Sequence, residues 1–334
     1  MTIKEVARLA GVSSAAVSRY MNGGSVSEEK RARIARAIEE TGYRPDMTAQ
    51  TLRTGRVRQI GVIVPKIFSE SVSQIMDGIS ECLAEKNYMT LLGCAGIDDA
   101  QEIRYLDIME RNRVAGIILM GTTMDPVKEK RLRECRVPLV VTGQNFEGFP
   151  CVYHDDFHAV KALTSLVLEK GRRRLAYIGV TERDFAAGKA RREGAQAALL
   201  AAGIDPETMP CTETSFDAEG GFQSARFLLA QHPDLDGFIC ATDNVALGAM
   251  MAVRESGRSV PADVSIVGVG DCWAGTISAP PLTTAHLRYR QCGVDAVRML
   301  LQRIEQEDPE QGEAQPSQIR QIRLPYTIIE RGSV

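Results

Sequence analysis

The sequence lacks the features that place a protein in a membrane or outside the cell. No apolar stretch approaches the ~18 residues that a membrane-spanning helix needs, and Lys4, Glu5 and Arg8 interrupt the N-terminal run that a signal peptide keeps apolar. The eight cysteines show no CxxC spacing and mostly lie within apolar runs, so we expect buried, reduced thiols. These absences predict a cytoplasmic protein.

Motifs of catalysis and cofactor binding are missing as well. There is no phosphate-binding loop, nucleophile elbow or dinucleotide fingerprint. Asp155 and Asp156 could serve as paired carboxylates, but neighbours on an extended segment point to opposite faces. His154 and His158 have the i, i+4 spacing of metal ligands, yet no motif supplies a third ligand. We therefore predict no enzyme activity, no metal site and no cofactor.

Positive charge is scarce over most of the chain and concentrated at its start. Residues 1–58 hold eleven Lys and Arg against six Asp and Glu, a net charge of +5, whereas the chain of 334 residues has a net charge of −3. A protein that neutralises phosphates requires such a local basic patch, whereas an ordinary soluble domain does not require one. The asymmetry indicates that the N-terminal segment binds nucleic acid.

The first 22 residues are typical of two short helices joined by a glycine turn at Gly11. Thr2 and Glu5 have the spacing of a capping box, and Ser13 can cap the second helix. The apolar face of the first helix comprises Ile3, Val6, Ala7 and Ala10, and that of the second comprises Val17 and Met21. The residues left on the outside of the second helix are small except for one arginine: Ser14, Ala15, Ser18 and Arg19. Such a helix can approach a duplex closely while one guanidinium reaches a base edge or a phosphate.

A third helix is predicted to follow Ser27 as its N-cap and to end at Gly42, with acidic residues in its first turn. Its inward residues should be Ile34, Ala35 and Ile38. Three helices of this kind close a small core. The same shape also occurs in bundles that bind no nucleic acid, and the local positive charge is what favours DNA here.

The remaining residues, about 275, are enough to bury two sizeable cores. Apolar runs alternate with helical stretches such as 71–86 and 159–169, which predicts doubly wound parallel sheets with ligands at the carboxyl ends of the strands. The expected strands are 60–64, 89–94, 114–120, 139–142, 175–180, 237–241, 264–269 and 323–329.

Three stretches together resemble the lactose-repressor family of bacterial transcription regulators: residues 2–22, Tyr43-Arg44-Pro45 and residues 49–55. The resemblance covers the whole chain. It implies an all-α helix-turn-helix headpiece over residues 1–57, including a hinge helix at 46–54. It also implies a periplasmic-binding-protein-like α/β core over 58–334, whose two subdomains flank a cleft. The first would comprise about 58–157 and 288–318, and the second about 158–287 and 319–334.

By this resemblance the helix at 13–20 reads the DNA, with Ser14 and Ala15 at variable positions and Arg19 as the fixed reader. The implied phosphate contacts are Thr2, Ser18, Asn22, Ser27 and Tyr43, and the hinge helix contributes Ala49 and Leu52, the leucine wedging into the minor groove between paired protomers. Three positions depart from the family: Ala16 and Asp46 replace the usual Thr and Asn, and Tyr20 replaces an aliphatic residue. A carboxylate beside phosphates weakens binding unless it turns away.

The loops that follow the long strands are where we expect the effector. Lys66 opens a helix and suits an anion, although a solvated surface lysine is an equal alternative. Arg191 matches the arginine that the family uses across its cleft, whereas helix capping explains Asp243 as well as ligand contact does. Trp273 could stack on a sugar or simply pack. The full predicted set is Lys66, Ser69, Glu70, Gln144, Asp155, Asp156, Arg191, Asp243, Asp271 and Trp273.

The sequence around Asp271 narrows the resemblance. Residues 268–271 read Gly-Val-Gly-Asp where the family usually has two carboxylates. This loss, together with residues 151–156, 178–180 and 188–191, makes the chain most similar to the trehalose-repressor and Gram-positive sucrose-repressor branch, and the basic residue Lys66 is a feature of the trehalose-type members. The resemblance implies a repressor that trehalose or sucrose, free or 6-phosphorylated, releases from a palindromic operator as an inducer. No leucine heptads follow the last strand, which favours a homodimer. The alternative is a global carbon-catabolite regulator controlled by a phosphorylated carrier protein.

Overall fold

The computed structural model of the protein describes residues 2–21, 24–43, 57–306 and 319–334. The chain forms two compact units, Met1–Val57 and Arg58–Val334. The expected hinge helix at 46–54, with Ala49 and Leu52, lies outside the described residues, as does Asn22.

The N-terminal unit is a bundle of three helices, α1 (Ile3–Ala10), α2 (Ser14–Met21) and α3 (Glu28–Thr41). Thr2 and Glu5 form the predicted capping box, and Gly11 ends α1 with a φ of 61°, a left-handed conformation that glycine adopts without strain. The small core of this unit consists of Val6, Ala7, Ala10, Val17, Ile34 and Ala37.

One face of α3 differs from its predicted pattern. Ala37 is buried with Ile34, whereas Ala35 and Ile38 are only half-buried. Residues three apart lie on the same face of a helix, so Ala37 lies on the buried face with Ile34. Ala35 follows Ile34 directly in the sequence and is therefore turned to the side of that face. Ser27 holds the predicted N-cap position, but its hydroxyl makes no capping hydrogen bond.

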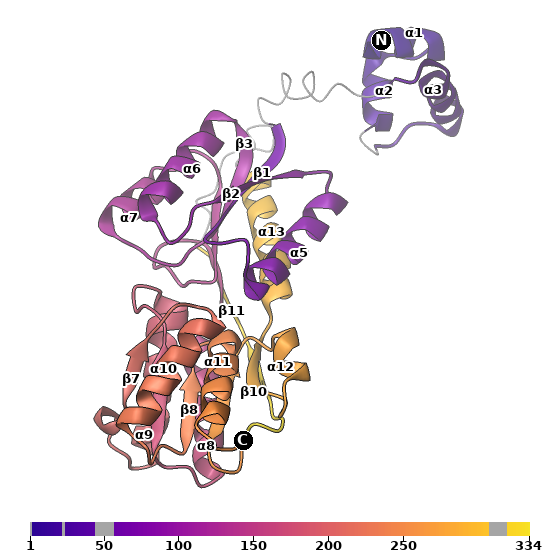
Figure 1. Ribbon diagram of the computed structural model, residues 1–334. Helices are drawn as coiled ribbons and strands as arrows, with labels where there is room; N and C mark the ends of the chain where they lie inside the picture. The colour runs from indigo at the N-terminus through magenta and orange to yellow at the C-terminus, as the bar shows by residue number, and fades with distance from the viewer. Residues whose placement is uncertain (1, 22–23, 44–56, 307–318) are drawn as a thin grey trace. The chain divides into compact units, whose positions relative to one another are not determined.

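Two six-stranded sheets form the larger unit, one in each subdomain (Figure 1). The strands of the first subdomain follow the order β11-β5-β4-β3-β1-β2. Their bounds are β1 Val57–Val64, β2 Met89–Cys94, β3 Val114–Met120, β4 Leu139–Thr142, β5 Cys151–His154 and β11 Gln321–Leu324. The accompanying helices are α5 (Glu70–Glu85), α6 (Asp99–Arg111), α7 (Pro126–Arg133) and α13 (Tyr289–Gln306).

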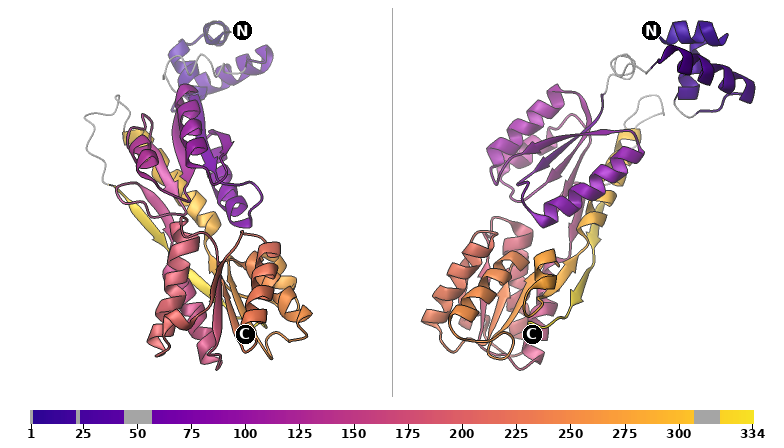
Figure 2. Two further views of the ribbon diagram at one scale, coloured as in Figure 1. Left: turned by 60° about the vertical axis from the view of Figure 1, so that its left-hand side comes forward. Right: turned by 45° about the vertical axis from the view of Figure 1, so that its right-hand side comes forward.

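The strands of the second subdomain follow the order β12-β10-β9-β8-β6-β7, and β12 is antiparallel to β10. Their bounds are β6 Leu175–Gly179, β7 Cys211–Glu213, β8 Gly237–Cys240, β9 Ser265–Val269, β10 Thr283–Leu287 and β12 Tyr326–Ile329. Helices cover both faces of each sheet (Figure 2). Those of this subdomain are α8 (Asp156–Glu169), η1 (Phe185–Ala190), α9 (Arg191–Ala201), η2 (Pro206–Thr208), α10 (Ala218–Gln231), α11 (Asp243–Glu255) and α12 (Trp273–Ile277). The doubly wound architecture expected from the sequence is confirmed.

The C-terminal segment corrects one expectation. The prediction of a single strand at 323–329 is wrong, because β11 and β12 are separated by Pro325 and belong to different sheets. Residues 319–334 therefore do not all lie in the second subdomain, since β11 pairs with β5 of the first. Proline fixes φ and has no N–H to donate to a ladder, which suits the point where the chain leaves one sheet for the other.

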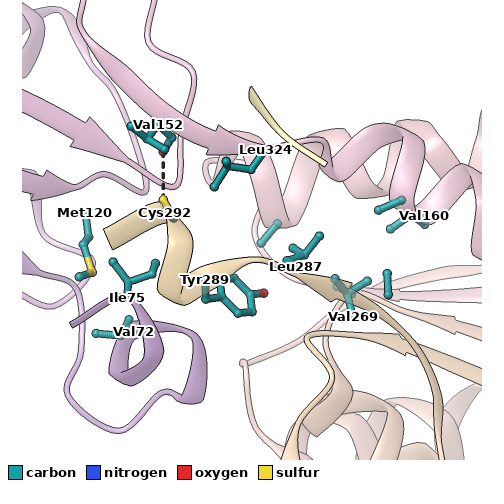
Figure 3. Packing of buried hydrophobic residues seen from close by; sticks show 14 of the residues in the cluster. Val72, Ile75, Met120, Val152, Val160, Val269, Leu287, Tyr289, Cys292 and Leu324 are labelled. Carbon is teal, nitrogen blue, oxygen red and sulfur yellow. Dashed lines mark hydrogen bonds between the residues drawn. The ribbon is translucent and has the colours of Figure 1, made fainter. Parts of the chain in front are cut away.

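A buried apolar cluster lies where the chain crosses between the subdomains. Figure 3 shows Tyr289 and Cys292 at the start of α13, with Val72 and Ile75 of α5 beside this turn and the side chain of Cys292 directed toward Val152. The thiol of Cys292 donates to the carbonyl of Val152 at 3.3 Å. The crossing after β10 is thus packed against the first sheet.

The eight cysteines are all free, which agrees with the expected reduced thiols, but only four of them are buried: Cys82 and Cys135 are half-buried, and Cys94 and Cys211 are exposed. Cys94 ends β2 and Cys211 begins β7, and each of these strands is at the edge of its sheet. An edge strand has neighbours on one side only and leaves more of its surface to solvent. Within the described parts of the chain, no helix combines the length and apolar character needed to cross a bilayer.

Helices α5 and α13 approach closely through two glycines. A Cβ placed on Gly293 would lie 2.1 Å from the carbonyl oxygen of Ile75, and one on Gly78 would lie 2.1 Å from that of Arg290. Both obstacles are backbone atoms, which cannot rotate out of the way. The contact between these helices therefore depends on the missing side chains.

We expect Gly293→Ala to lower the free energy of unfolding by about 1–3 kcal/mol, the usual cost of overpacking, although alanine favours a helix more than glycine does. Chemical denaturation would measure the change. Ser80→Ala, at an exposed position of α5, is the matched control and should be neutral or slightly stabilising. Equal stability of the Gly293→Ala variant and the wild type would contradict the close approach.

Candidate functional site

The exposed face of α2 carries the residues expected to read DNA. Ala15 and Arg19 are exposed, and Ser14 and Ser18 are half-buried. The stem of Arg19 packs on Gly24, where an added Cβ would lie 2.7 Å from Arg19 Cγ. The N–H of Gly24 also donates to the carbonyl of Arg19 at 2.8 Å. The backbone and the first side-chain carbons of Arg19 are therefore held by Gly24, while the residue remains exposed to solvent.

The other predicted DNA contacts in the described part of the headpiece differ in how they are held. The hydroxyl of Thr2 accepts from the Glu5 N–H at 3.4 Å, so it already serves the capping box. Ser27 is exposed, and Tyr43 packs half-buried against the core. Ala16 is buried, which explains why a residue that cannot form hydrogen bonds is tolerated there. Exposed basic residues surround this unit: Lys4, Arg8, Lys30, Arg31, Arg33 and Arg36.

A cleft lies between the two subdomains at the carboxyl ends of their strands, the usual ligand position in such sheets. Its empty volume is about 1140 Å³, including its open mouth. Seven of the ten predicted effector residues line it: Lys66, Ser69, Glu70, Gln144, Asp156, Arg191 and Asp243.

An ion pair between Arg191 and Asp156 forms part of the wall that the second subdomain contributes. Nε and Nη2 of Arg191 lie 2.8 and 2.7 Å from Asp156 Oδ1, and Nη1 donates to the carbonyl of Ala241 at 2.5 Å. The arginine is 6% exposed and the aspartate 5%. Because a charge removed from water needs its partner, this pair joins the starts of α8 and α9 to the end of β8.

Asp243 is also held by its surroundings. Its Oδ2 accepts from the N–H of Cys272 at 2.7 Å, and its Oδ1 accepts from the hydroxyl of Thr284 at 2.6 Å. Burial raises the pKa of Asp243 to about 6. The capping role considered for this position belongs to Thr242, whose hydroxyl accepts from the N–H of Val245 at 3.3 Å. Asp243 instead ties α11 to β10 and to the loop after β9.

Gln144 joins the two walls of the cleft. Its Nε2 donates to Asp184 Oδ1 at 2.7 Å, and its Oε1 accepts from the N–H of Ala186 at 3.0 Å. Asp184 caps the π-helix η1, and burial raises its pKa. The loop after β4 is therefore hydrogen-bonded to the loop after β6.

Lys66 makes a second contact across the cleft. Its Nζ lies 4.3 Å from the ring centre of Phe216, a cation–π geometry. Burial lowers the pKa of Lys66, while the carboxylates of Asp217 and Asp184 oppose that shift. The lysine is thus partly buried and not the solvated surface residue that the sequence left open.

Two further pairs bridge the subdomains. The backbone N–H of Trp273 donates to Glu70 Oε1 at 3.1 Å, and Arg183 Nη2 donates to Asp99 Oδ2 at 3.2 Å. Both pairs are at least partly exposed, so each contributes little by itself. Together with Gln144 and Lys66, they hold the subdomains in one arrangement.

Three predicted effector residues do not line the cleft. Asp155 caps α8 and hydrogen-bonds the ring of His158 at 2.7 Å. Asp271 pairs with Arg331 at 2.5 Å and with His286 at 3.1 Å, so its carboxylate is engaged away from the cleft. The side chain of Trp273 is 69% exposed. Residues next to them in the sequence line the cleft, but Asp155 serves a local cap, Asp271 pairs with residues distant in the chain, and Trp273 lies in solvent.

Several residues that line the cleft were not in the predicted set. Asp184 follows β6, and Phe216 supplies the aromatic surface that we expected from Trp273. His154 and Tyr289 lie edge to face with their ring centres 5.0 Å apart. His154 belongs to the stretch 151–156 that was expected to meet the effector, but it was singled out only as a possible metal ligand; its position as the last residue of β5 was the signal for a cleft residue. Nothing local marked Tyr289, which reaches the cleft through the crossing after β10.

A helix-turn-helix unit combined with two doubly wound subdomains around a cleft defines the class of ligand-responsive transcription regulators. The chain belongs to the lacI family of bacterial regulatory proteins, whose profile matches residues 2–46. The profile of the periplasmic binding protein-like domain matches residues 164–334.

Curated relatives and solved structures agree with this assignment. The chain is 31% identical to the sucrose operon repressor of Staphylococcus xylosus over 309 residues, 92% of this chain and 95% of that protein. It is 33% identical to the transcriptional regulator CelR of Thermobifida fusca over 321 residues, 92% of this chain and 93% of that protein. The structure of a CelR–cellobiose complex matches with a TM-score of 0.73 and 28% identity, covering 100% of both chains. The fold also matches the lac repressor dimer bound to operator and the anti-inducer ONPF, with a TM-score of 0.85 at 24% identity over 100% of this chain and 98% of that one.

We expect Arg191→Met to lower the free energy of unfolding by about 3–5 kcal/mol, because it leaves the Asp156 carboxylate buried without its partner. Adding Asp156→Leu should recover most of the loss, and urea denaturation of both variants would measure this. Arg290→Met, which breaks an exposed pair with Asp77, is the control and should cost less than about 1 kcal/mol. If the double variant were as unstable as the single one, the pair would not be the source of the effect.

Proposed function

We propose that this regulator represses a carbohydrate-utilisation operon and that a small sugar bound in the cleft releases it from a palindromic operator. The observation that carries the proposal is a cleft lined by hydrogen-bonding groups from both subdomains. Support comes from relatives that are named for sucrose and ribose operons and from the CelR structure, which contains cellobiose.

The proposed switch has two states of a homodimer. In one state the two headpieces are held at the spacing of the operator half-sites, and in the other the sugar has changed the arrangement of the subdomains and separated the hinge segments. The cross-cleft contacts of Gln144 and Lys66 are the interactions that a bound sugar would replace or reinforce. A coupling free energy of ~1–3 kcal/mol between sugar and operator would be sufficient for tens-fold release.

The charge of the cleft favours an uncharged disaccharide such as trehalose or sucrose over its 6-phosphate. The lining contains two basic side chains, Arg191 and Lys66. Arg191 forms an ion pair with Asp156, whereas Lys66 lies over the ring of Phe216 and forms no ion pair with a carboxylate. The acidic residues of the lining are Glu70, Asp156, Asp184 and Asp243. A phosphate would add negative charge to a space where carboxylates already outnumber the cations.

For DNA recognition, we expect Arg19→Ala to abolish the preference for operator while leaving weak, salt-sensitive binding to random DNA, because phosphate contacts give affinity and the base contact gives specificity. The operator would be the palindrome that the wild type selects from a random duplex library, and fluorescence anisotropy would measure both affinities. Lys30→Ala, which removes an exposed headpiece charge away from α2, should weaken both DNAs in parallel. Undiminished discrimination by Arg19→Ala would remove its assigned role.

For the effector, we expect trehalose or sucrose to release the operator complex at lower concentration than the corresponding 6-phosphate. Anisotropy titrations of the full chain on its selected palindrome would measure the release. The opposite order, together with a loss confined to the 6-phosphate in Lys66→Ala, would establish the phosphorylated sugar instead. Release by a phosphorylated carrier protein and by none of the sugars would establish the catabolite regulator and overturn the sugar proposal.

A further inference from the structure

Three buried polar atoms on the first-subdomain wall of the cleft have no hydrogen-bond partner. They are Oγ1 of Thr122, Oγ1 of Thr142 and Nε2 of His154. These residues are 8%, 0% and 5% exposed, and all three line the cleft. They follow or end β3, β4 and β5, which are neighbours in the sheet, so they form one row along its carboxyl edge. We call these three residues the threonine–histidine row.

Such a row is unusual in a folded interior. Buried polar groups are nearly always hydrogen-bonded, and each unpaired one costs about 1–3 kcal/mol. The charged groups of the opposite wall are different, because Arg191 and Asp156 bind each other and Asp243 is bonded to Thr284. Among the buried polar side chains that line the cleft, the unpaired atoms are therefore those of the threonine–histidine row.

The surroundings of His154 determine what can bind there. The ring packs edge-on against Tyr289 and hydrogen-bonds the backbone carbonyl of Arg288. A neutral imidazole has one N–H donor and one acceptor nitrogen, so an Nδ1 proton directed at that carbonyl leaves Nε2, which has no partner, as the acceptor. Burial lowers the pKa of His154, which keeps the ring neutral at pH 7. Nε2 is left as an acceptor and requires a donor from a ligand.

We propose that the threonine–histidine row binds the hydroxyl edge of an uncharged sugar ring, with one sugar hydroxyl donating to His154 Nε2. The inference rests on the proposed function and adds the residues that select the ligand. Threonine hydroxyls both donate and accept, as sugar hydroxyls do, so adjacent hydroxyls can bond along the row. A phosphate dianion or a carboxylate has no proton to give at Nε2, and such a group on a ligand would lie elsewhere.

The test begins with trehalose, sucrose and cellobiose titrated calorimetrically into the full chain. With each sugar that binds, Thr142→Val should weaken affinity by about 3- to 10-fold, the value of one hydrogen bond, while the unliganded protein keeps or gains thermal stability. Lower affinity with unchanged or higher stability is expected because valine keeps the shape of the threonine side chain and removes a hydroxyl that has no partner in the unliganded protein. Thr164→Val is the matched control, since its buried hydroxyl already bonds the carbonyl of Val160 in α8 at 2.9 Å; it should keep full affinity.

Two further measurements separate ligand contact from packing. Among monodeoxy analogues of the bound sugar, one should bind the wild type more weakly than the parent sugar does, yet bind Thr142→Val as well as the parent sugar does. This comparison is a double-mutant cycle between protein and ligand. In ¹⁵N spectra of the imidazoles, saturating sugar should move the Nε2 resonance of His154 and leave those of His158 and His232 unchanged.

The outcomes are distinguishable. Sugars that bind equally well to the wild type and to the Thr122→Val and Thr142→Val variants, without moving the His154 resonance, would overturn the row as a ligand site and would leave the proposed function intact. In that case ordered water satisfies the three atoms. If none of the three sugars bound or released operator, the proposed function would fall and this inference with it.

Discussion

The ion pair between Arg191 and Asp156 determines what the cleft can bind. It fixes the starts of two helices against the end of β8, and both of its members are buried, so removing one charge leaves the other buried without its partner. The guanidinium of Arg191, which from sequence was expected to bind the ligand, instead bonds Asp156 and the carbonyl of Ala241. Free hydrogen-bonding capacity is found on the opposite wall, at Thr122, Thr142 and His154. The buried charged groups of one wall are thus paired, whereas the other wall holds the unpaired polar atoms.

The two walls are already connected across the cleft. Gln144 bonds Asp184 and Lys66 lies over Phe216, and each of these contacts has one member in each subdomain. A small molecule that enters between them changes the free-energy difference between arrangements of the subdomains only through its differential contacts. Because each existing contact is modest, a few hydrogen bonds from a sugar are comparable with what holds the arrangement. The cleft is suited to a switch of a few kcal/mol.

Much of the fold and part of the site could be predicted from sequence because the signals are local. The capping box at Thr2, the strand runs such as 89–94 and 114–120, and the alternation of strand and helix depend on residues close together in the chain. Loops after strands were also correctly located, and Lys66, Gln144 and Arg191 line the cleft. Side-chain direction was less predictable: Asp155 and Asp271 follow their nearest cap or cation instead.

The sequence by itself determined the family, the helix-turn-helix headpiece and the doubly wound core, since periodicity, caps and short motifs are properties of neighbouring residues. Only the tertiary structure decided that Pro325 passes the chain between two sheets, that Tyr289 reaches the cleft, and that the threonine–histidine row lacks partners. These facts depend on residues far apart in the chain being brought together. Whether a buried polar atom is satisfied is a property of all its neighbours at once, and no local pattern encodes it.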